Sequence, residues 1–194
     1  SQIQAFIDRV AGEAGPSPID TAVEQAATLM EAGDHAQAYT VFEQILAHDP
    51  TNAAAIGGAI RCQISNGDLA NARARLDTVD PNLIDQSDIA GARAALELAE
   101  ETINADDGDN LMTLRNELDK DANNHQTRYD LACVLWGSGE RALAVDELLE
   151  IIGRNRMWND EAARKQLVKY FDAMGPTDPL TVEARGRLSS LLFA

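Results

Sequence analysis

The chain has 194 residues and a formal net charge of −16, with 32 Asp and Glu against 16 Lys and Arg. Nucleic acids and anionic membranes are bound through Lys and Arg, so this balance argues against both as partners. Apolar residues make up 45% of the sequence, enough to bury a core, and no apolar run is long enough to span a membrane.

The first predicted element is a short amphipathic helix over residues 1–12, SQIQAFIDRVAG. Glycine and proline interrupt the helical pattern after it and predict a linker over residues 13–18. The apolar face of this helix must be buried, either on the rest of the chain or in an upstream domain. Because the chain begins with Ser1 rather than methionine, we expect it to be a fragment of a longer protein.

Three glycines, Gly33, Gly67 and Gly139, set the frame of the remaining chain. Each is followed by an acidic residue, by an alanine five positions on and by a large apolar residue nine positions on. The first two lie 34 residues apart, and the third lies 72 residues further on, which is two periods plus four residues. This period and pattern are typical of the tetratricopeptide repeat, a helix–turn–helix unit that stacks into a solenoid.

These landmarks predict an all-α fold, a right-handed superhelix of about four tetratricopeptide-like helix pairs plus terminal helices over residues 19–194. We place the repeats at about 19–52, 53–86, 91–124 and 125–158, the third of them degenerate, and the terminal helices at 159–194. Within the last part, helices are predicted at about 160–174 and from Pro179 onward, the latter capped by Asp178.

A solenoid of this kind presents a concave groove lined by the first helix of each repeat. In this frame the groove carries an apolar stripe formed by Met30, Ile64, Tyr129 and Trp136. Exposed methionine and aromatic side chains suit the binding of unfolded or helical protein segments. Alternatively, the first or the final helix fills the groove and covers the stripe. The groove lacks the Lys and Asn set that clamps a peptide's terminal carboxylate, which disfavours an adaptor for chaperone tails.

The chain ends on an apolar segment, SSLLFA, containing Leu188, Leu191, Leu192 and Phe193. This segment either caps the solenoid or leaves an apolar surface free for a partner. Cys62 and Cys133 form no CxxC motif, and no Cys/His cluster has the spacing of a zinc site, so we predict neither metal nor cofactor. The two cysteines are interpreted as buried thiols of a protein in a reducing compartment.

Nearly the whole chain resembles one family. SQIQAFIDRVAG resembles the last helix of a thioredoxin domain. The first repeat, the degenerate middle and above all the tail ARKQLVKYFDAMGPTDPLTVEARGRLSSLLFA resemble the C-terminal region of thioredoxin–tetratricopeptide proteins. These are the chaperedoxins of the CnoX/YbbN type.

The resemblance implies a bacterial cytoplasmic co-chaperone that holds unfolding clients under oxidative stress and passes them to the GroEL chaperonin. The chaperonin contact would map to about 179–194. The thioredoxin cysteines would lie upstream, so any thiol–disulfide activity would belong there and this chain would not itself be an enzyme. The alternative left open is a module that dimerises, or positions a thioredoxin domain for disulfide exchange and redox homeostasis.

Overall fold

The structure is a computed structural model that describes residues 17–103 and 109–193. The predicted helix over 1–12 and most of the predicted linker lie outside these residues. The described part is helical, and its helices are α2 (Pro18–Glu31), α3 (His35–His48), α4 (Ala53–Ser65), α5 (Leu69–Asp77), α6 (Ser87–Ile103), α7 (Asp109–Lys120), α8 (His125–Gly137), α9 (Arg141–Arg154), α10 (Ala162–Met174) and α11 (Pro179–Phe193). None of these helices is long and apolar enough to cross a membrane.

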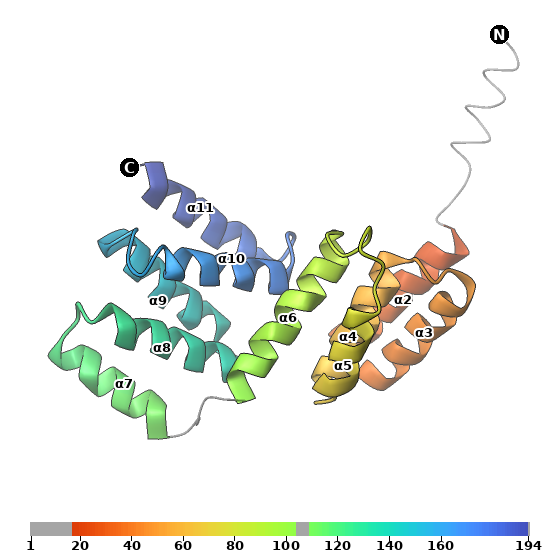
Figure 1. The fold of residues 1–194 in the computed structure, drawn as a ribbon, viewed down its shortest axis with the longest axis horizontal. Coiled ribbons are helices and arrows are strands. Elements are labelled where there is room, and N and C mark those ends of the chain that lie inside the picture. Colours follow the sequence, from red (N-terminus) through yellow and green to blue (C-terminus); the bar gives the residue numbers. More distant parts are fainter. Residues whose placement is uncertain (1–16, 104–108, 194) are drawn as a thin grey trace, which may run out of the picture.

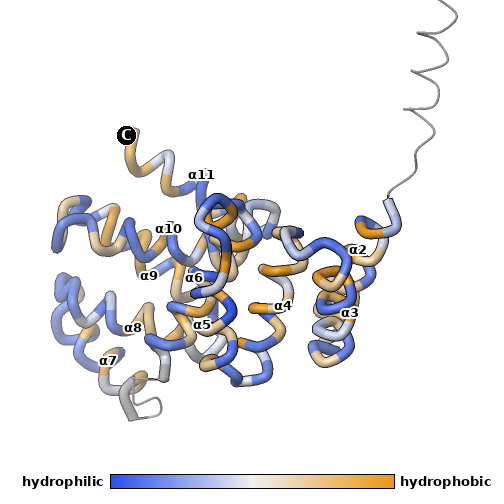
Figure 2. Tube along the Cα trace, turned by 45° about the vertical axis from the view of Figure 1, so that its right-hand side comes forward, coloured by the Kyte–Doolittle hydropathy of each residue, from blue (hydrophilic) through white to orange (hydrophobic). Residues whose placement is uncertain are grey.

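The predicted fold class, a helical repeat solenoid, is confirmed (Figure 1). Consecutive helices pack as pairs and the pairs stack on one another, with α2–α5 on one side of α6 and α7–α11 on the other. Figure 2 shows hydrophobic and hydrophilic segments alternating along the helices. This alternation is the pattern of amphipathic helices that each bury one face.

The turns between paired helices form as the glycine landmarks predict. Gly33, Gly67 and Gly139 have φ angles of 81°, 76° and 86°, a left-handed conformation that closes a helix and that glycine adopts at low cost. Asp34 then accepts a hydrogen bond from the Gln37 backbone N–H at 3.3 Å, which caps α3.

Helix α6 connects the two halves of the solenoid. One set of its buried residues (Ile89, Ala92 and Leu96) belongs to an apolar cluster with α4 and α5. Another set (Ala94 and Leu98) belongs to the large cluster formed with α7–α11. Helix α10 therefore packs against α6 although α7, α8 and α9 intervene in the sequence.

Ion pairs join α10 to α6 as well. The Lys169 Nζ lies 3.1 Å from a Glu97 carboxylate oxygen and 2.6 Å from one of Glu101. These pairs sit at the edge of the interface, where water screens them, so apolar burial rather than charge holds the two helices together.

The terminal helices differ slightly from the sequence-based boundaries. Helix α10 begins at Ala162 rather than near residue 160, because Asn159, Asp160 and Glu161 all adopt left-handed φ angles of 46°, 53° and 62°. Asp178 caps α11 as predicted, its Oδ1 accepting hydrogen bonds from the backbone N–H groups of Leu180 and Thr181.

Candidate protein-binding groove

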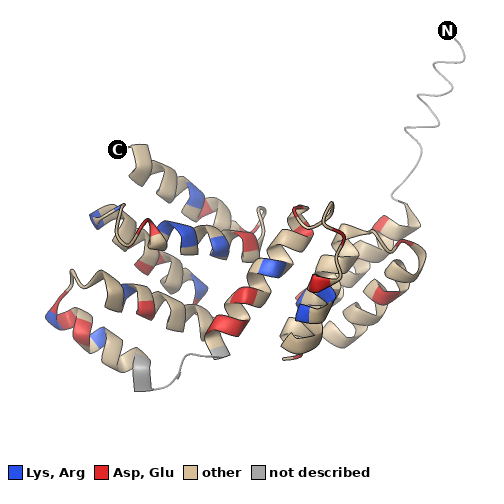
Figure 3. Cartoon of the chain, viewed as in Figure 1, with Lys and Arg blue, Asp and Glu red and all other residues tan. Residues whose placement is uncertain are grey.

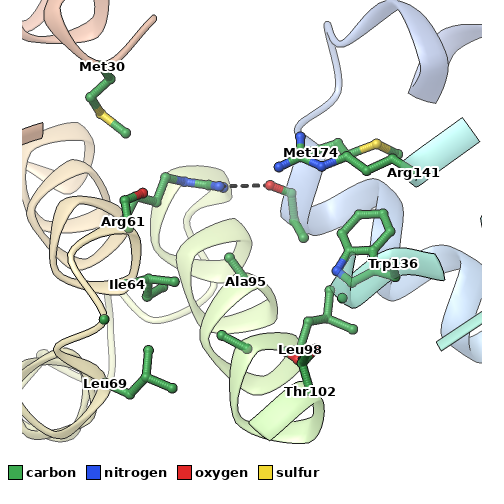
Figure 4. Close-up of a pocket in the computed structure, with 15 residues that line it drawn as sticks. Met30, Arg61, Ile64, Leu69, Ala95, Leu98, Thr102, Trp136, Arg141 and Met174 are labelled. Atoms are coloured by element: carbon green, nitrogen blue, oxygen red, sulfur yellow. Dashed lines mark hydrogen bonds between the residues drawn. The ribbon is translucent and has the colours of Figure 1, made fainter. Parts of the chain in front are cut away.

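Three of the four predicted stripe residues, Met30, Ile64 and Trp136, line one open groove of about 510 Å³ (Figure 4). The groove lies where the two halves of the solenoid meet over α6. The other residues that line it are Arg61, Ser65, Gly67, Leu69, Ala95, Leu98, Ala99, Thr102, Gly137, Arg141, Ala173 and Met174. No residue of α11 belongs to this lining, so the final helix does not fill the groove.

Two apolar walls face each other across the groove (Figure 4). Met30, Ile64 and Leu69 come from α2, α4 and α5 and form one wall. Trp136 and Met174 come from α8 and α10 and form the other. Side chains of α6 lie between the walls. The arrangement combines flexible thioethers with one flat aromatic ring, a composition that adapts to differently shaped apolar side chains.

Trp136 is held rigidly. Its ring stacks on that of Tyr170, with centroids 3.8 Å apart and an interplanar angle of 12°. Tyr170 is fully buried, and its hydroxyl donates to the Ala132 carbonyl oxygen at 3.3 Å. Burial raises the pKa of Tyr170, so this hydroxyl stays protonated and remains a donor. The indole therefore forms a fixed surface on the groove wall.

Tyr129, the fourth stripe residue, is not part of the groove lining. It lies on the same helix as Trp136 but two turns earlier, about 10 Å along the axis. Its hydroxyl donates to Gln166 Oε1 at 3.2 Å, and its ring packs against Trp158 with centroids 5.6 Å apart. Contacts with α10 and the preceding loop thus occupy this side chain.

Two arginines, neither of them part of the predicted apolar stripe, enter the same groove. Arg61 extends from α4 and donates from Nη1 to the Ala173 carbonyl oxygen at 2.7 Å. Arg141 extends from the first turn of α9, with its guanidinium carbon 5.6 Å from the centre of the Trp136 ring. The repeat frame does place Arg61 at a groove-lining position of the second repeat, and the structure agrees. Arg141 belongs to the second helix of its pair, and the repeat frame assigns groove-lining positions to the first helix only.

One carboxylate, that of Asp88 on α6, acts on the charge of Arg61 from outside the groove lining. Burial lowers the pKa of the Arg61 guanidinium, the Asp88 carboxylate opposes this effect, and the positive charge of Arg141 adds to it. No aspartate or glutamate is among the residues that line the groove. In a chain with 32 acidic residues, this local excess of positive charge is unusual.

The four apolar residues of the terminal segment divide between core and surface. Leu188 is buried with Thr181 and Ala184 on the face of α11 that packs on the preceding helices. Leu191 and Leu192 are half-buried, and Phe193 is 87% exposed. The segment therefore both seals the end of the solenoid and leaves one aromatic ring in solvent.

Neither cysteine has the surroundings of a reactive thiol. Cys62 is buried and Cys133 half-buried, and both are free. Burial raises the pKa of each thiol to about 11, well above the range of nucleophilic cysteines. Across residues 17–103 and 109–193, no group of three His, Cys, Asp or Glu side chains is placed to hold a metal ion.

Comparison with protein-family models supports the repeat interpretation. Two family profiles, both described as tetratricopeptide repeat, match residues 29–96 and 104–193. The crystal structure of a domain of a Vibrio parahaemolyticus protein of unknown function is similar to this chain, with 22% identity and a TM-score of 0.43 over 89% of this chain and 98% of that one. Comparison with curated proteins gives no match. The chain therefore carries a tetratricopeptide-repeat region, a kind of solenoid that generally mediates contacts between proteins without catalysis.

Proposed function

We propose that this chain is the protein-interaction module of a thioredoxin-fold co-chaperone. Its groove receives apolar segments of unfolding client proteins, and α11 docks on a GroEL-type chaperonin. The observation that carries the proposal is the open groove in which Met30, Ile64 and Met174 face the fixed ring of Trp136. Two parts of the proposal, the thioredoxin-fold co-chaperone and the GroEL-type chaperonin as its partner, rest on the resemblance of the tail to chaperedoxins.

The composition of the groove favours an apolar protein segment over a small polar substrate. Its side chains are mainly aliphatic, aromatic or thioether, and it contains no histidine, cysteine or carboxylate for acid–base or nucleophilic chemistry. A groove of this kind binds by removing apolar surface from water, at roughly 25 cal/mol per Å².

The docking half of the proposal is supported by the exposed face of α11. Val182 and Phe193 are 59% and 87% exposed and, being eleven residues apart, lie on the same side of α11, about 16 Å from each other along its axis. Charge also distinguishes this end of the molecule, since residues 154–193 carry seven Lys and Arg against five Asp and Glu (Figure 3). A partner would thus meet an apolar and locally basic surface on an otherwise acidic protein.

Client binding is tested by the aggregation of a chemically denatured enzyme, followed by light scattering with and without the full chain. We expect the chain to suppress aggregation, the double variant Met30→Gln/Ile64→Gln to lose most of this effect, and the matched control Met112→Gln on α7 to retain it. Equal suppression by all three proteins would contradict a role for the groove.

Docking is tested by co-purification with the chaperonin. Phe193→Ser should reduce co-purification without changing the helical circular dichroism, because Phe193 contributes little to the core. Undiminished co-purification would contradict docking through α11. A stable dimer that dissociates on this same substitution would instead favour the alternative, a dimerisation module.

A further inference from the structure

The groove contains a pair of arginines whose charges no side chain of its lining neutralises. In Figure 4 the guanidinium groups of Arg61 and Arg141 extend toward each other above α6, and the dashed line marks the hydrogen bond from Arg61 to the carbonyl oxygen of Ala173. A single carbonyl oxygen accepts from one of the two groups. Within residues 17–103 and 109–193, neither guanidinium group makes a further hydrogen bond or an ion pair.

We propose that the groove binds an apolar protein segment carrying one acidic side chain, whose carboxylate lies between Arg61 and Arg141. This inference rests on the proposed client-binding function and adds the chemistry by which clients are selected. A carboxylate at this point accepts hydrogen bonds from both guanidinium groups and removes the repulsion between them.

The position of the arginine pair indicates an acidic side chain within a segment rather than a chain terminus. Apolar walls lie on both sides of the pair, with Ile64 and Leu69 on one side and Trp136 and Met174 on the other. An internal Asp or Glu places apolar neighbours against both walls. A terminal carboxylate leaves one wall uncovered, and the lining contains no Asn or Lys to position it.

The acidic character of the whole chain gives this pair a selective role. Long-range repulsion from a net charge of −16 disfavours acidic segments everywhere except where a local positive potential offsets it. Segments with several acidic residues are therefore repelled. Purely apolar segments bind through the walls alone, and those with one well-placed carboxylate gain the arginine contacts in addition.

The inference is tested with three Ser-flanked, Leu/Ala-rich peptides of about 12 residues. One has a central Glu and blocked ends, the second a central Gln and blocked ends, and the third a central Gln and a free carboxyl terminus. Binding to the full chain is followed by the fluorescence of Trp136 in a Trp158→Phe background. We expect the Glu peptide to bind about tenfold more tightly than the blocked Gln peptide, as charge-assisted hydrogen bonds predict.

Arg141→Gln is the decisive variant, because Arg141 is exposed and its loss leaves the Arg61 contact with α10 in place. It should reduce the preference for Glu over Gln to less than about threefold. Arg115→Gln, the same charge change on the exposed face of α7, should retain the preference.

The possible outcomes distinguish three claims: the selection of a carboxylate, its internal position in the segment, and client binding itself. Equal binding of the two blocked peptides overturns the selection of a carboxylate and leaves the groove as an apolar site. Tighter binding of the peptide with the free carboxyl terminus than of the Glu peptide overturns the internal position. If none of the peptides binds, the proposed client-binding function fails, and this inference fails with it.

Discussion

The Arg61 side chain donates a hydrogen bond of 2.7 Å to the backbone carbonyl oxygen of Ala173, which lies 112 residues further along the chain. The last carbonyl groups of a helix have no partner within that helix, and Ala173 stands one residue before the end of α10. Arg61 therefore supplies a cap from the opposite half of the solenoid. Apart from its effect on the groove, this contact links α4 in one half directly to α10 in the other.

Arg61→Met should lower the free energy of unfolding by about 1–3 kcal/mol, because it leaves the Ala173 carbonyl without its hydrogen-bond donor. Urea denaturation followed by circular dichroism measures the change. Arg93→Met is the matched control, since Arg93 lies on the neighbouring α6 and makes no hydrogen bond or ion pair in the described part of the structure. Equal losses in both variants would show that the cap is not responsible.

Gly91→Ala should also be destabilising, by about 1–3 kcal/mol. A Cβ at Gly91 would lie 2.5 Å from Arg61 Nη2 and 2.6 Å from the backbone oxygen of Asp172, so α6 and α10 would have to separate. At Gly186 in α11 a Cβ meets nothing within 4 Å, and Gly186→Ala should instead stabilise the chain by about 0.5–1 kcal/mol through helix propensity. The midpoint of thermal unfolding should therefore fall for Gly91→Ala and rise for Gly186→Ala. A shift in the same direction for both variants would rule out the close approach of α6 and α10 as the cause.

Both cysteines should resist thiol reagents in the folded protein. With a pKa of about 11, only about one thiol in a thousand is ionised at pH 8, and burial further limits access. Titration with a chromogenic disulfide at pH 8 should therefore release the chromophore slowly from the folded protein. In urea, two equivalents of chromophore per chain should be released rapidly. Rapid reaction of one thiol in the native chain would mean that its surroundings open readily.

Stability should fall in alkaline solution. Burial raises the pKa values of Cys62 and Cys133 to about 11 and that of Tyr129 to about 12, from ordinary values of 9.0 and 10.0. The unfolded chain thus releases these protons first, so the stabilisation is complete below about pH 9 and is lost as the pH rises through 11 to 12. Urea midpoints between pH 7 and 11 in 0.5 M salt, which screens the general repulsion between carboxylates, should show this decline. A constant midpoint would refute it.

Asp160→Gly should raise the free energy of unfolding by about 0.5–1 kcal/mol. Asp160 adopts a φ of 53° between two other left-handed residues, and glycine takes this conformation without the steric cost of a Cβ. Thr177→Gly, in the next exposed turn but with an ordinary backbone conformation, should leave stability unchanged or slightly lower. A loss in Asp160→Gly would indicate that the aspartate side chain itself stabilises the turn.

The repeats could be predicted from the sequence because their signals are local. Gly33 and Asp34 determine a turn within a few residues, and such turns recur at a fixed period. The approach of α10 to α6 is not local: it depends on how three intervening helices pack. For this reason the position of Trp136 in the groove could be predicted from the sequence, whereas that of Arg141 could not.

The same distinction applies to the terminal segment. Its four apolar residues look alike in the sequence, although Leu188 is buried and Phe193 exposed. Helical periodicity separates them only once the face that meets the preceding helices is known. Which of them remain available to a partner therefore follows from packing and not from hydrophobicity.

The two buried faces of α6 have a consequence for synthesis of the chain on the ribosome. The face with Ile89 and Leu96 meets helices that have already been made. The face with Ala94 and Leu98 packs against α10, whose last residue is made 71 residues after the end of α6. At ordinary rates of translation this takes roughly 4–14 s. During that interval the nascent chain exposes an unpaired apolar helix face, so a pause in translation before α10 would leave an intermediate prone to aggregation.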